Sequence, residues 1–271
     1  MSTELDFFNS SYGQYQSSRL RRPIEMFQDM FSDLRLRNNP AYRLMRKNSE
    51  AIPSRNVLVV GVEVPSRSED LKKVLRRVSE SRHRVTAESV PLRDEKGKYQ
   101  NINAGLLDFC LDDFDWLIVL DDDVALPSRF LDNFLYVAES ANLQLCQPAH
   151  TLHSFQSYNL TRRESNCLAR VTHFVECGPL TAFHRSIFRH VVPFPELRWA
   201  WGTDIYWSEL AQSKEFRLGV VDCTPVTHLR RLGRSYDGDV ARNEAIRFLQ
   251  DKGVHRSRES ILKTVEMISH F

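Results

Sequence analysis

The sequence predicts an α/β protein in which helices flank a central, mainly parallel sheet. Short apolar runs rich in valine, isoleucine and leucine, typical of strands buried on both faces, alternate along the chain with segments of helical periodicity. Strands that alternate with helices at this spacing form right-handed crossover units between parallel strands. The chain has 271 residues, of which 42% are hydrophobic and 27% charged, an ordinary composition for a globular protein with a sizeable core.

The regular part of this pattern begins after residue 55. Residues 57–62 form an apolar run typical of a buried strand, and residues 68–78 follow with apolar side chains at helical spacing. Residues 85–92 alternate enough to predict a second strand. A polar loop then leads into a helix that begins near Asn101. These elements predict one complete strand–helix–strand unit and the crossover helix of the next.

The strand that follows is the most informative stretch of the chain. Residues 116–120 are five apolar residues in a row, too few for a typical helix, and Asp121, Asp122 and Asp123 come directly after them. Open α/β sheets place their ligand sites at the carboxyl ends of strands. Consecutive carboxylates repel one another, and their burial is costly unless a cation or hydrogen-bond donors compensate. Taken alone, the three acids also fit a solvated turn before the helix that starts near Pro127.

The second half of the chain continues the alternation less regularly. We expect a helix over residues 127–138, a strand over 143–147, a surface loop over 150–167, a strand over 171–177, a helix over 205–213, an edge-like strand over 218–222, and amphipathic helices over 241–249 and 261–268. Loops as long as the one over 150–167 are usually functional or disordered.

The charge distribution argues against nucleic-acid binding. The formal net charge is +2, but residues 1–55 and 228–271 each hold nine Lys or Arg and six Asp or Glu. The body of the chain between them therefore holds 19 basic and 23 acidic residues. A nucleic-acid-binding fold would carry its basic excess on the body. We therefore expect no nucleic-acid partner.

Apolar runs and cysteines predict the compartment. No apolar run approaches the length of a membrane span, and the polar N-terminus lacks the apolar core of a signal peptide. Five scattered cysteines without a C-x-x-C pair are typical of reduced thiols. The sequence thus predicts a cytoplasmic protein.

Residues 1–55 form a basic, amphipathic extension. Phe27, Met30, Phe31 and Leu34 have helical spacing, and two clusters of arginines flank them. Such a helix either docks on anionic lipid or, more commonly, covers its own domain. Peripheral contact with the inner face of a membrane is therefore one hypothesis for this extension.

The order of the motifs is more specific than any one of them. A first strand ends near Pro65 and Arg67, a helix starts at Asn101–Gly105, three acids follow a strand, Glu176–Pro179 precede Phe183–Ser186, Trp201–Asp204 form an aromatic segment, and His228 follows a late strand. This order resembles the nucleotide-sugar glycosyltransferases of the GT-A fold, especially the large inverting family with a D-x-D motif that includes cellulose- and chitin-type synthases. The resemblance implies a Rossmann-like GT-A catalytic domain over residues 56–236, between the extension over 1–55 and a C-terminal helical extension over 237–271.

The resemblance also implies a metal site formed by Asp121, Asp123 and His228. A period of two projects Asp121 and Asp123 to one side of the strand and Asp122 to the other. A nucleoside diphosphate leaves with developing charge on its oxygens, which Mn²⁺ or Mg²⁺ neutralises as a Lewis acid. A histidine ligand tilts the choice toward Mn²⁺. The alternative for His228 is a strand-end histidine that bonds to a neighbouring carbonyl.

Asp204 is the candidate catalytic base. Inverting transfer needs one carboxylate to take the proton of the acceptor hydroxyl group. The aromatic neighbours Trp199, Trp201, Tyr206 and Trp207 would desolvate Asp204, raise its pKa and offer a stacking face for a sugar ring. The alternative is that Asp204 caps the following helix and that the aromatic residues are core.

A further set of residues is expected to contact the nucleotide sugar. These are Pro65, Arg67, Asn103, Asp121, Asp122, Gly178, Trp201, Arg231 and Arg234. Guanidinium groups pair well with phosphate, so Arg231 and Arg234 would close over the diphosphate, unless they form a plain solvated turn. Gly178 suits a turn that passes close to the donor sugar, or a turn without that role. Lys98 and Glu176 are weaker candidates.

These observations predict metal-dependent transfer of a sugar from a nucleotide-diphosphate donor, with UDP favoured and GDP possible, to a hydroxyl group of a glycan, lipid or small molecule. Three alternatives remain. The first is a non-catalytic module that binds nucleotide or sugar. The second is a sugar-phosphate nucleotidyltransferase, which needs a glycine-rich loop where this chain has Val64–Arg67. The third is a phosphatase of the haloacid-dehalogenase type, whose D-x-D-x-[TV] signature fits Asp121–Val124 but belongs on a first strand.

Overall fold

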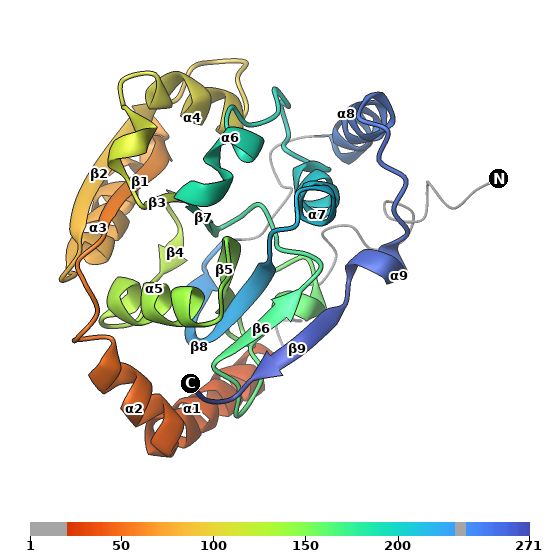
Figure 1. Ribbon diagram of the computed structural model, residues 1–271. Coiled ribbons are helices and arrows are strands. Elements are labelled where there is room, and N and C mark those ends of the chain that lie inside the picture. Colours follow the sequence, from red (N-terminus) through yellow and green to blue (C-terminus); the bar gives the residue numbers. More distant parts are fainter. Residues whose placement is uncertain (1–20, 231–236) are drawn as a thin grey trace.

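The computed structural model describes residues 21–230 and 237–271 of the chain (Figure 1). Within these residues, nine strands form a central sheet in the order β2-β1-β3-β7-β5-β8-β6-β9, with β4 paired to β8. The strands are β1 (Asn56–Glu63), β2 (Arg84–Pro91), β3 (Trp116–Leu120), β4 (Val124–Ala125), β5 (Leu145–His150), β6 (Ala169–Thr172), β7 (Leu180–His184), β8 (Leu218–His228) and β9 (Thr264–Ile268). The α-helices are α1 (Arg22–Asn38), α2 (Pro40–Asn48), α3 (Ser68–Ser79), α4 (Lys98–Leu106), α5 (Phe130–Ser140), α6 (Phe188–Val191), α7 (Thr203–Ser213), α8 (Gly238–Asp251) and α9 (Arg258–Ile261).

The predicted α/β class, with helices flanking a central sheet, is confirmed. Strand β1 pairs in parallel with β2 and β3, and β5 pairs in parallel with β8. The other five pairings are antiparallel, so the sheet is mixed. Two of these five pairings involve β7, which is reached from a loop and not from a crossover helix. It lies antiparallel between β3 and β5, where it joins the two parallel parts of the sheet.

Strand β3 separates two hydrophobic cores on opposite faces of the sheet. Its alternate side chains Ile118 and Leu120 pack on one face with the apolar sides of α3 and α5. Leu117 and Val119 pack on the other face with α4 and α7. All five residues of β3 are fully buried. This explains why the strand is a continuous apolar run, and it fixes the point at which the acids emerge.

The C-terminal third differs from the sequence prediction in two places. The expected edge-like strand over 218–222 is the buried, eleven-residue strand β8, which pairs with β4, β5 and β6. It continues past Pro225 because the β5–β8 pairing shifts register between Pro148 and His150, which accommodates the prolines.

The expected helix over 261–268 is wrong. Only Arg258–Ile261 is helical, as α9, and Thr264–Ile268 is β9, an edge strand paired with β6. Threonine, valine and isoleucine favour extended backbone there, and side chains of alternate polarity suit an edge. The C-terminal segment is therefore not purely helical, because it adds a strand to the central sheet.

Two further findings concern the helices and the cysteines. Among the described residues, no helix combines the length and the apolar character that a membrane span requires. The five cysteines are free thiols, as their scattered spacing predicts.

Candidate functional site

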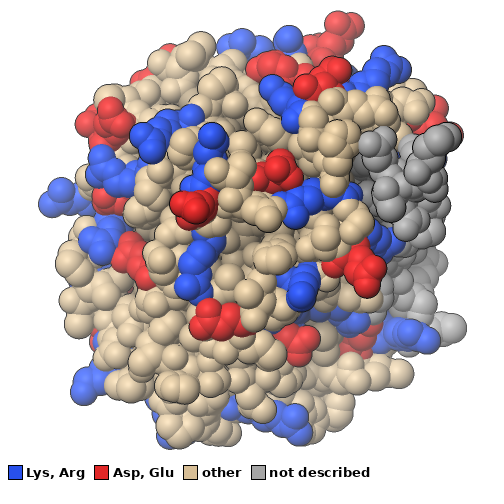
Figure 2. Space-filling view, turned by 45° about the vertical axis from the view of Figure 1, so that its right-hand side comes forward, with Lys and Arg blue, Asp and Glu red and all other residues tan. Residues whose placement is uncertain are grey.

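A cleft of about 800 Å³ opens at the carboxyl ends of β1 and β3, the edge at which open α/β sheets bind ligands. Its lining includes Val62, Val64, Arg67, Gly97, Lys98, Asp121, Asp122, Asp123, Ser157, Glu176, Gly178, Arg198, Trp199, Trp201, Asp204 and His228. The sequence motifs thus meet in one place, although they are spread over more than half of the chain. On the face that Figure 2 shows, basic and acidic side chains of the described residues are interspersed, and neither sign forms a continuous stripe.

The structure brings Asp121, Asp123 and His228 together. One ligand atom of each lies within 4.8 Å of the others, and His228 Nε2 is 3.1 Å from Asp123 Oδ1. Backbone pairing sets this geometry, because Val124 of β4 is opposite His228 of β8, and the N–H of Leu229 donates to the carbonyl of Asp123 at 2.9 Å. Two carboxylates and an imidazole so close together form a donor set that suits a divalent cation such as Mn²⁺.

The protonation of this group supports the same conclusion. Burial raises the pKa of Asp123, but the hydrogen bond and charge of His228 outweigh it and hold the pKa below its ordinary value. Burial lowers the pKa of His228, but Asp123 and then Asp121 raise it above its ordinary value. The raised pKa of His228 favours a proton on the imidazole beside Asp123. A divalent cation would displace that proton.

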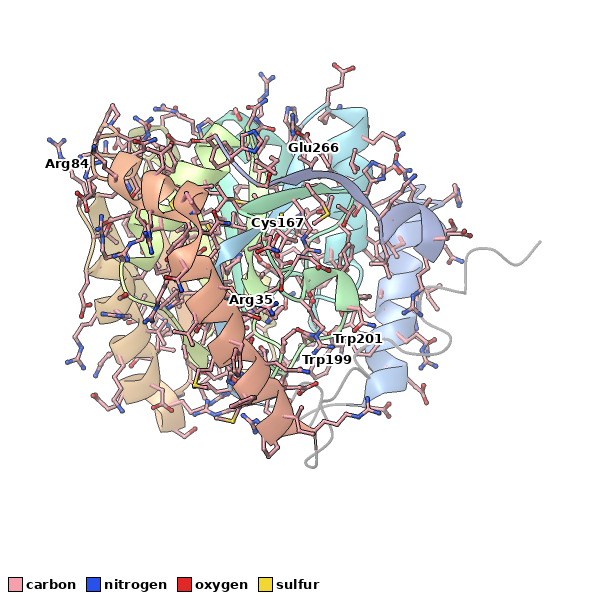
Figure 3. All side chains as sticks on the ribbon, turned by 90° about the horizontal axis from the view of Figure 1, so that it is seen from below. Arg35, Arg84, Cys167, Trp199, Trp201 and Glu266 are labelled. Atoms are coloured by element: carbon pink, nitrogen blue, oxygen red, sulfur yellow. The ribbon has the colours of Figure 1, made fainter. Side chains whose placement is uncertain are left out.

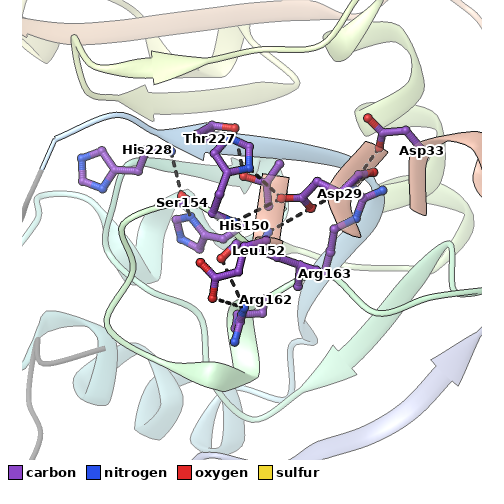
Figure 4. A network of polar contacts seen from close by, with 12 residues as sticks. Asp29, Asp33, His150, Leu152, Ser154, Arg162, Arg163, Thr227 and His228 are labelled. Carbon is purple, nitrogen blue, oxygen red and sulfur yellow. Dashed lines mark hydrogen bonds and ion pairs between the residues drawn. The ribbon is translucent and has the colours of Figure 1, made fainter. Parts of the chain in front are cut away.

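A polar network behind the cleft positions the backbone of His228 (Figure 4). Its backbone N–H donates to Ser154 Oγ at 2.8 Å, and Ser154 Oγ is 3.1 Å from Nδ1 of the buried His150. Thr151 and Thr227 join their hydroxyl groups at 2.9 Å. The predicted loop over 150–167 therefore braces the end of β8, a role that its irregular sequence does not indicate.

Asp121 contacts a lysine that the sequence marked only weakly. Lys98 Nζ lies 2.7 Å from Asp121 Oδ1 and donates to the carbonyl of Cys177 at 3.2 Å. Gly178 is close by, since a Cβ atom there would be 3.1 Å from Asp121 Oδ2. The glycine leaves room beside the carboxylate, so a ligand can approach the backbone at this point.

Asp122 lines the same cleft, but its side chain contacts arginines and not the lysine or histidine that pair with Asp121 and Asp123. Its Oδ1 accepts hydrogen bonds from Arg67 at 3.1 Å and from Arg230 at 3.2 Å. Burial raises its pKa, and Arg67 opposes that rise. Asp122 therefore fixes the side chains of Arg67 and Arg230. This is a structural role, whereas the sequence predicts a direct contact with the nucleotide sugar.

Asp204 lies in the first turn of α7 and is 3% exposed. The N-cap position is Gly202, with φ of +85°, so the alternative that Asp204 caps the helix is not supported. Its Oδ1 accepts from the N–H of Ile205 at 2.9 Å. Trp199 and Trp201 line the cleft beside it and lie close together in Figure 3.

The other two aromatic residues of that segment face elsewhere. Trp207 is fully buried and packs against Tyr99 and Phe183 in the core. Tyr206 packs against Phe248 of α8. Only half of the aromatic segment is therefore available to a ligand.

Glu176 is another buried carboxyl group in the cleft. Burial raises its pKa to about 7, against the hydrogen bonds that it accepts from Thr161 and from the N–H of Ser157. His150 Nε2 is 3.9 Å away, and burial lowers the pKa of that imidazole to about 3. The pair is therefore neutral in the fold at mildly acidic pH.

Arg198 is the residue that the sequence prediction missed. It lines the cleft, stacks on Trp199 with 5.3 Å between guanidinium carbon and ring centroid, and has a buried Nη1 without a hydrogen-bond partner among the described residues. An unpaired buried guanidinium N–H favours an anionic ligand. The place of Arg198 next to the aromatic segment is the one feature of the sequence that could have indicated this residue. Sequence spacing alone does not show in which direction its side chain points.

Several predicted donor contacts fall outside the cleft. The side-chain oxygen of Asn103 accepts from the backbone N–H of Phe194 at 2.8 Å, and its side-chain nitrogen donates to the backbone carbonyl of Phe194 at 2.9 Å. Asn103 therefore joins α4 to the segment at Phe194. Pro65 starts the short 3₁₀ helix over Pro65–Arg67 and is not among the lining residues. Arg231 and Arg234 lie outside the described residues.

Comparisons with known proteins give distant structural similarities. No family model and no curated protein sequence matches the chain. GalNAc-T7 with UDP, GalNAc and Mn²⁺ superposes with a TM-score of 0.49 and 11% identity, over 72% of this chain and 48% of that one. S. aureus TarS with UDP-GlcNAc gives 0.45 and 10%, over 68% of this chain and 62% of the other. A Drosophila beta-1,4-galactosyltransferase 7 mutant with manganese, UDP-Gal and xylobiose gives 0.44 and 14%, over 76% and 83%.

This chain thus spans about half of the first of these structures and less than two thirds of the second. Similarity at this level says little about chemistry. We therefore base the function on the residues of the cleft.

Proposed function

We propose that the protein is a metal-dependent glycosyltransferase that moves a sugar from a nucleotide-diphosphate donor to a hydroxyl acceptor. The observation that carries this proposal is the meeting of Asp121, Asp123 and His228 in one cleft with the buried carboxyl group of Asp204. The first three residues fit a divalent cation, and the fourth fits a general base. A module that only binds nucleotide or sugar has no need of a general base.

The donor diphosphate would lie beside the acids. A divalent ion bound by Asp121, Asp123 and His228 would supply Lewis-acid neutralisation of the leaving diphosphate. Arg67 and Arg198 bring further positive charge to the cleft lining, where their N–H groups would bond to phosphate oxygens.

The remaining space suits the sugar. Gly178 leaves the backbone open beside Asp121, and the ring of Trp201 offers an apolar stacking face in the lining. The resemblance of the sequence motifs favours UDP as the nucleotide, with GDP as the alternative.

Asp204 would take the proton of the acceptor hydroxyl group. An inverting reaction then follows, in which the acceptor oxygen attacks the sugar carbon opposite the bond to the diphosphate, that bond breaks, and the nucleotide leaves. Trp199 and Trp201 line the cleft with Asp204, and with a donor bound they would limit the access of water to the carboxylate and so the hydrolysis of the donor.

A screen for nucleotide release tests this proposal. The full chain is incubated with UDP- and GDP-sugars and a panel of glycan, lipid and small-molecule alcohols, with Mn²⁺, Mg²⁺ or EDTA. We expect release with at least one donor, and loss of release with EDTA. Asp123→Asn should lower the rate by about a hundredfold or more, because it removes a metal ligand worth several kcal/mol.

The matched control is Asp113→Asn, an exposed acid near the opposite end of β3, which should leave the rate unchanged. Metal-dependent nucleotide binding without turnover for any acceptor would support the non-catalytic module instead. Formation of pyrophosphate from a nucleoside triphosphate and a sugar phosphate would identify a nucleotidyltransferase, although the chain has a short 3₁₀ helix after β1 where that enzyme needs a glycine-rich loop.

A further inference from the structure

The polarity of α1 is the reverse of that of an ordinary surface helix. Its inner side buries Glu25 and Asp29, which are only 5% and 4% exposed. Its outer side carries the large apolar residues Ile24, Met26, Phe27, Met30, Phe31 and Leu34, each at least 47% exposed. A surface helix normally packs its apolar stripe on the core, as α3 does in this fold. Seen from below, α1 lies in front of the sheet (Figure 3).

Ion pairs fix α1 in this orientation (Figure 4). Asp29 accepts a hydrogen bond from the N–H of Leu152 at 3.0 Å and pairs with Arg163 at 3.2 Å. Glu25 pairs with Arg162 at 3.3 Å. If the helix turned to bury its apolar side, these buried charges would lose their partners, which is strongly unfavourable. The exposed apolar side is therefore a consequence of specific inward contacts.

The charge around this apolar side is basic. The acids of α1 and of the turn after α2 pair with arginines from other elements, Glu25 with Arg162, Asp29 and Asp33 with Arg163, and Glu50 with Arg129. The exposed basic residues of the two helices and their ends are Arg21, Arg35, Arg37, Arg43 and Lys47. The net field that α1 and α2 present outward is thus positive.

We propose that the outer side of α1, together with the adjoining basic residues of α2, docks on a membrane surface that carries anionic lipid. The apolar side chains would enter the boundary between headgroups and acyl chains, and the arginines would pair with anionic headgroups. A helix of 17 residues offers a face about 25 Å long. The proposal does not depend on glycosyl transfer.

Charge complementarity favours lipid over a protein partner. The exposed basic residues lie at both ends of the apolar stripe of α1 and on the adjoining α2, which suits mobile headgroups on a flat surface. A second copy of the chain would bring the same positive charge against this face, which opposes self-association.

Vesicle co-sedimentation of the full chain tests the proposal. We expect binding to phosphatidylcholine vesicles that contain phosphatidylserine, and little binding to phosphatidylcholine alone. Phe27→Glu combined with Phe31→Glu should abolish binding. Arg35→Gln combined with Arg37→Gln should weaken it about 25-fold, because each basic residue near an anionic surface contributes about fivefold.

Matched controls are available elsewhere on the surface. Leu107→Glu changes an apolar residue that is 85% exposed, and Arg84→Gln changes an exposed arginine of β2, labelled with Arg35 in Figure 3. Both should leave binding unchanged, and circular dichroism checks that each variant is folded. The milder Met30→Ser should weaken binding without adding charge.

Three results would overturn the proposal. The first is equal binding of the wild type and the Phe27→Glu, Phe31→Glu variant, and the second is no binding to phosphatidylserine vesicles. The third is a wild-type dimer in sedimentation velocity that becomes a monomer in the Phe27→Glu, Phe31→Glu variant, since a second copy would then cover the face.

Discussion

Asp204 and Glu176 are two buried carboxyl groups in one cleft, and their surroundings assign them different properties. Asp204 lies at the start of α7, where the helix dipole favours a negative charge, and beside two tryptophans that line the cleft. Burial raises the pKa of Glu176 to about 7, so at neutral pH it is partly protonated. Of the two carboxyl groups, Asp204 is the one at the N-terminus of a helix, which favours the anion, so we assign the general base to Asp204.

The variant Asp204→Asn tests this assignment. The asparagine keeps an oxygen that can accept from the N–H of Ile205, so we expect an intact fold and nearly unchanged donor affinity. The transfer rate should fall by about a hundredfold or more, because the general base is gone. Isothermal titration with Mn²⁺ and nucleotide measures binding, and product formation measures transfer. Asp251→Asn, at the exposed end of α8, is the control and should change neither binding nor transfer. Loss of donor binding together with transfer in Asp204→Asn would make Asp204 a donor-binding residue.

The sequence could predict residues that a motif places at a strand end, and it failed for residues that a loop places. Asp121 and Asp123 follow β3 and His228 is the last residue of β8, and strand ends on one edge of a sheet meet. Arg198 lies on an irregular segment, whose path depends on the close approach of Gly97, where a Cβ atom would be 2.2 Å from the Arg198 carbonyl oxygen. No local pattern encodes such a contact. For the same reason Asn103 looked like a donor contact although its partner is the segment at Phe194.

At the scale of elements, the loop over 150–167 links the cleft to α1. Near the start of the loop, Ser154 accepts a hydrogen bond from the backbone N–H of His228 at the end of β8. Further along, Arg162 and Arg163 form ion pairs with the acids of α1 (Figure 4). Ser154 does not contact a ligand in this scheme. It positions His228 by accepting from its backbone N–H at 2.8 Å.

Ser154→Ala should therefore weaken Mn²⁺ binding by about tenfold, the effect typical of a group that orients a metal ligand. Titration calorimetry or the electron paramagnetic resonance signal of free Mn²⁺ measures this affinity. Ser269→Ala at the exposed C-terminal end is the control. Unchanged Mn²⁺ affinity in a folded Ser154→Ala protein would mean that β4 alone positions His228.

The elements also show where periodicity misleads. The helix expected over 261–268 is mostly β9, because a short amphipathic segment satisfies both periods and the exposed edge of β6 decides between them. Strand β8 was expected to end early, because Pro225 looks like a terminator until the register shift opposite it is known.

At the scale of the whole molecule, the alternation of strands and helices was sufficient to predict the layers. It was not sufficient to predict β7, because the mixed sequence Leu180–His184 has no pattern typical of a strand, or the antiparallel direction in which β7 pairs with β3 and β5. The burial that stabilises these layers also encloses ionisable side chains. Glu176 is 6% exposed, and its neutral form is favoured in the fold.

The last prediction concerns global stability and pH. Glu176 has a folded-state pKa of about 7 and an ordinary value of 4.5, so its contribution to stability is present below pH 4.5 and is lost as pH rises through about 7. Above that pH the fold must hold a buried carboxylate, at a cost on the order of 3 kcal/mol. Glu176→Gln stays neutral and should unfold at a higher temperature than the wild type at alkaline pH, with the difference vanishing at acidic pH.

Thermal unfolding without added metal or nucleotide, followed from acidic to alkaline pH, measures this difference. Glu88→Gln changes an exposed glutamate of β2 and should give a pH profile parallel to that of the wild type. If Glu176→Gln also runs parallel to the wild type, the pKa of the carboxyl group is the same in the folded and the unfolded chain. Its neighbours, Thr161, Ser157 and His150, would then have to stabilise the anion rather than the acid.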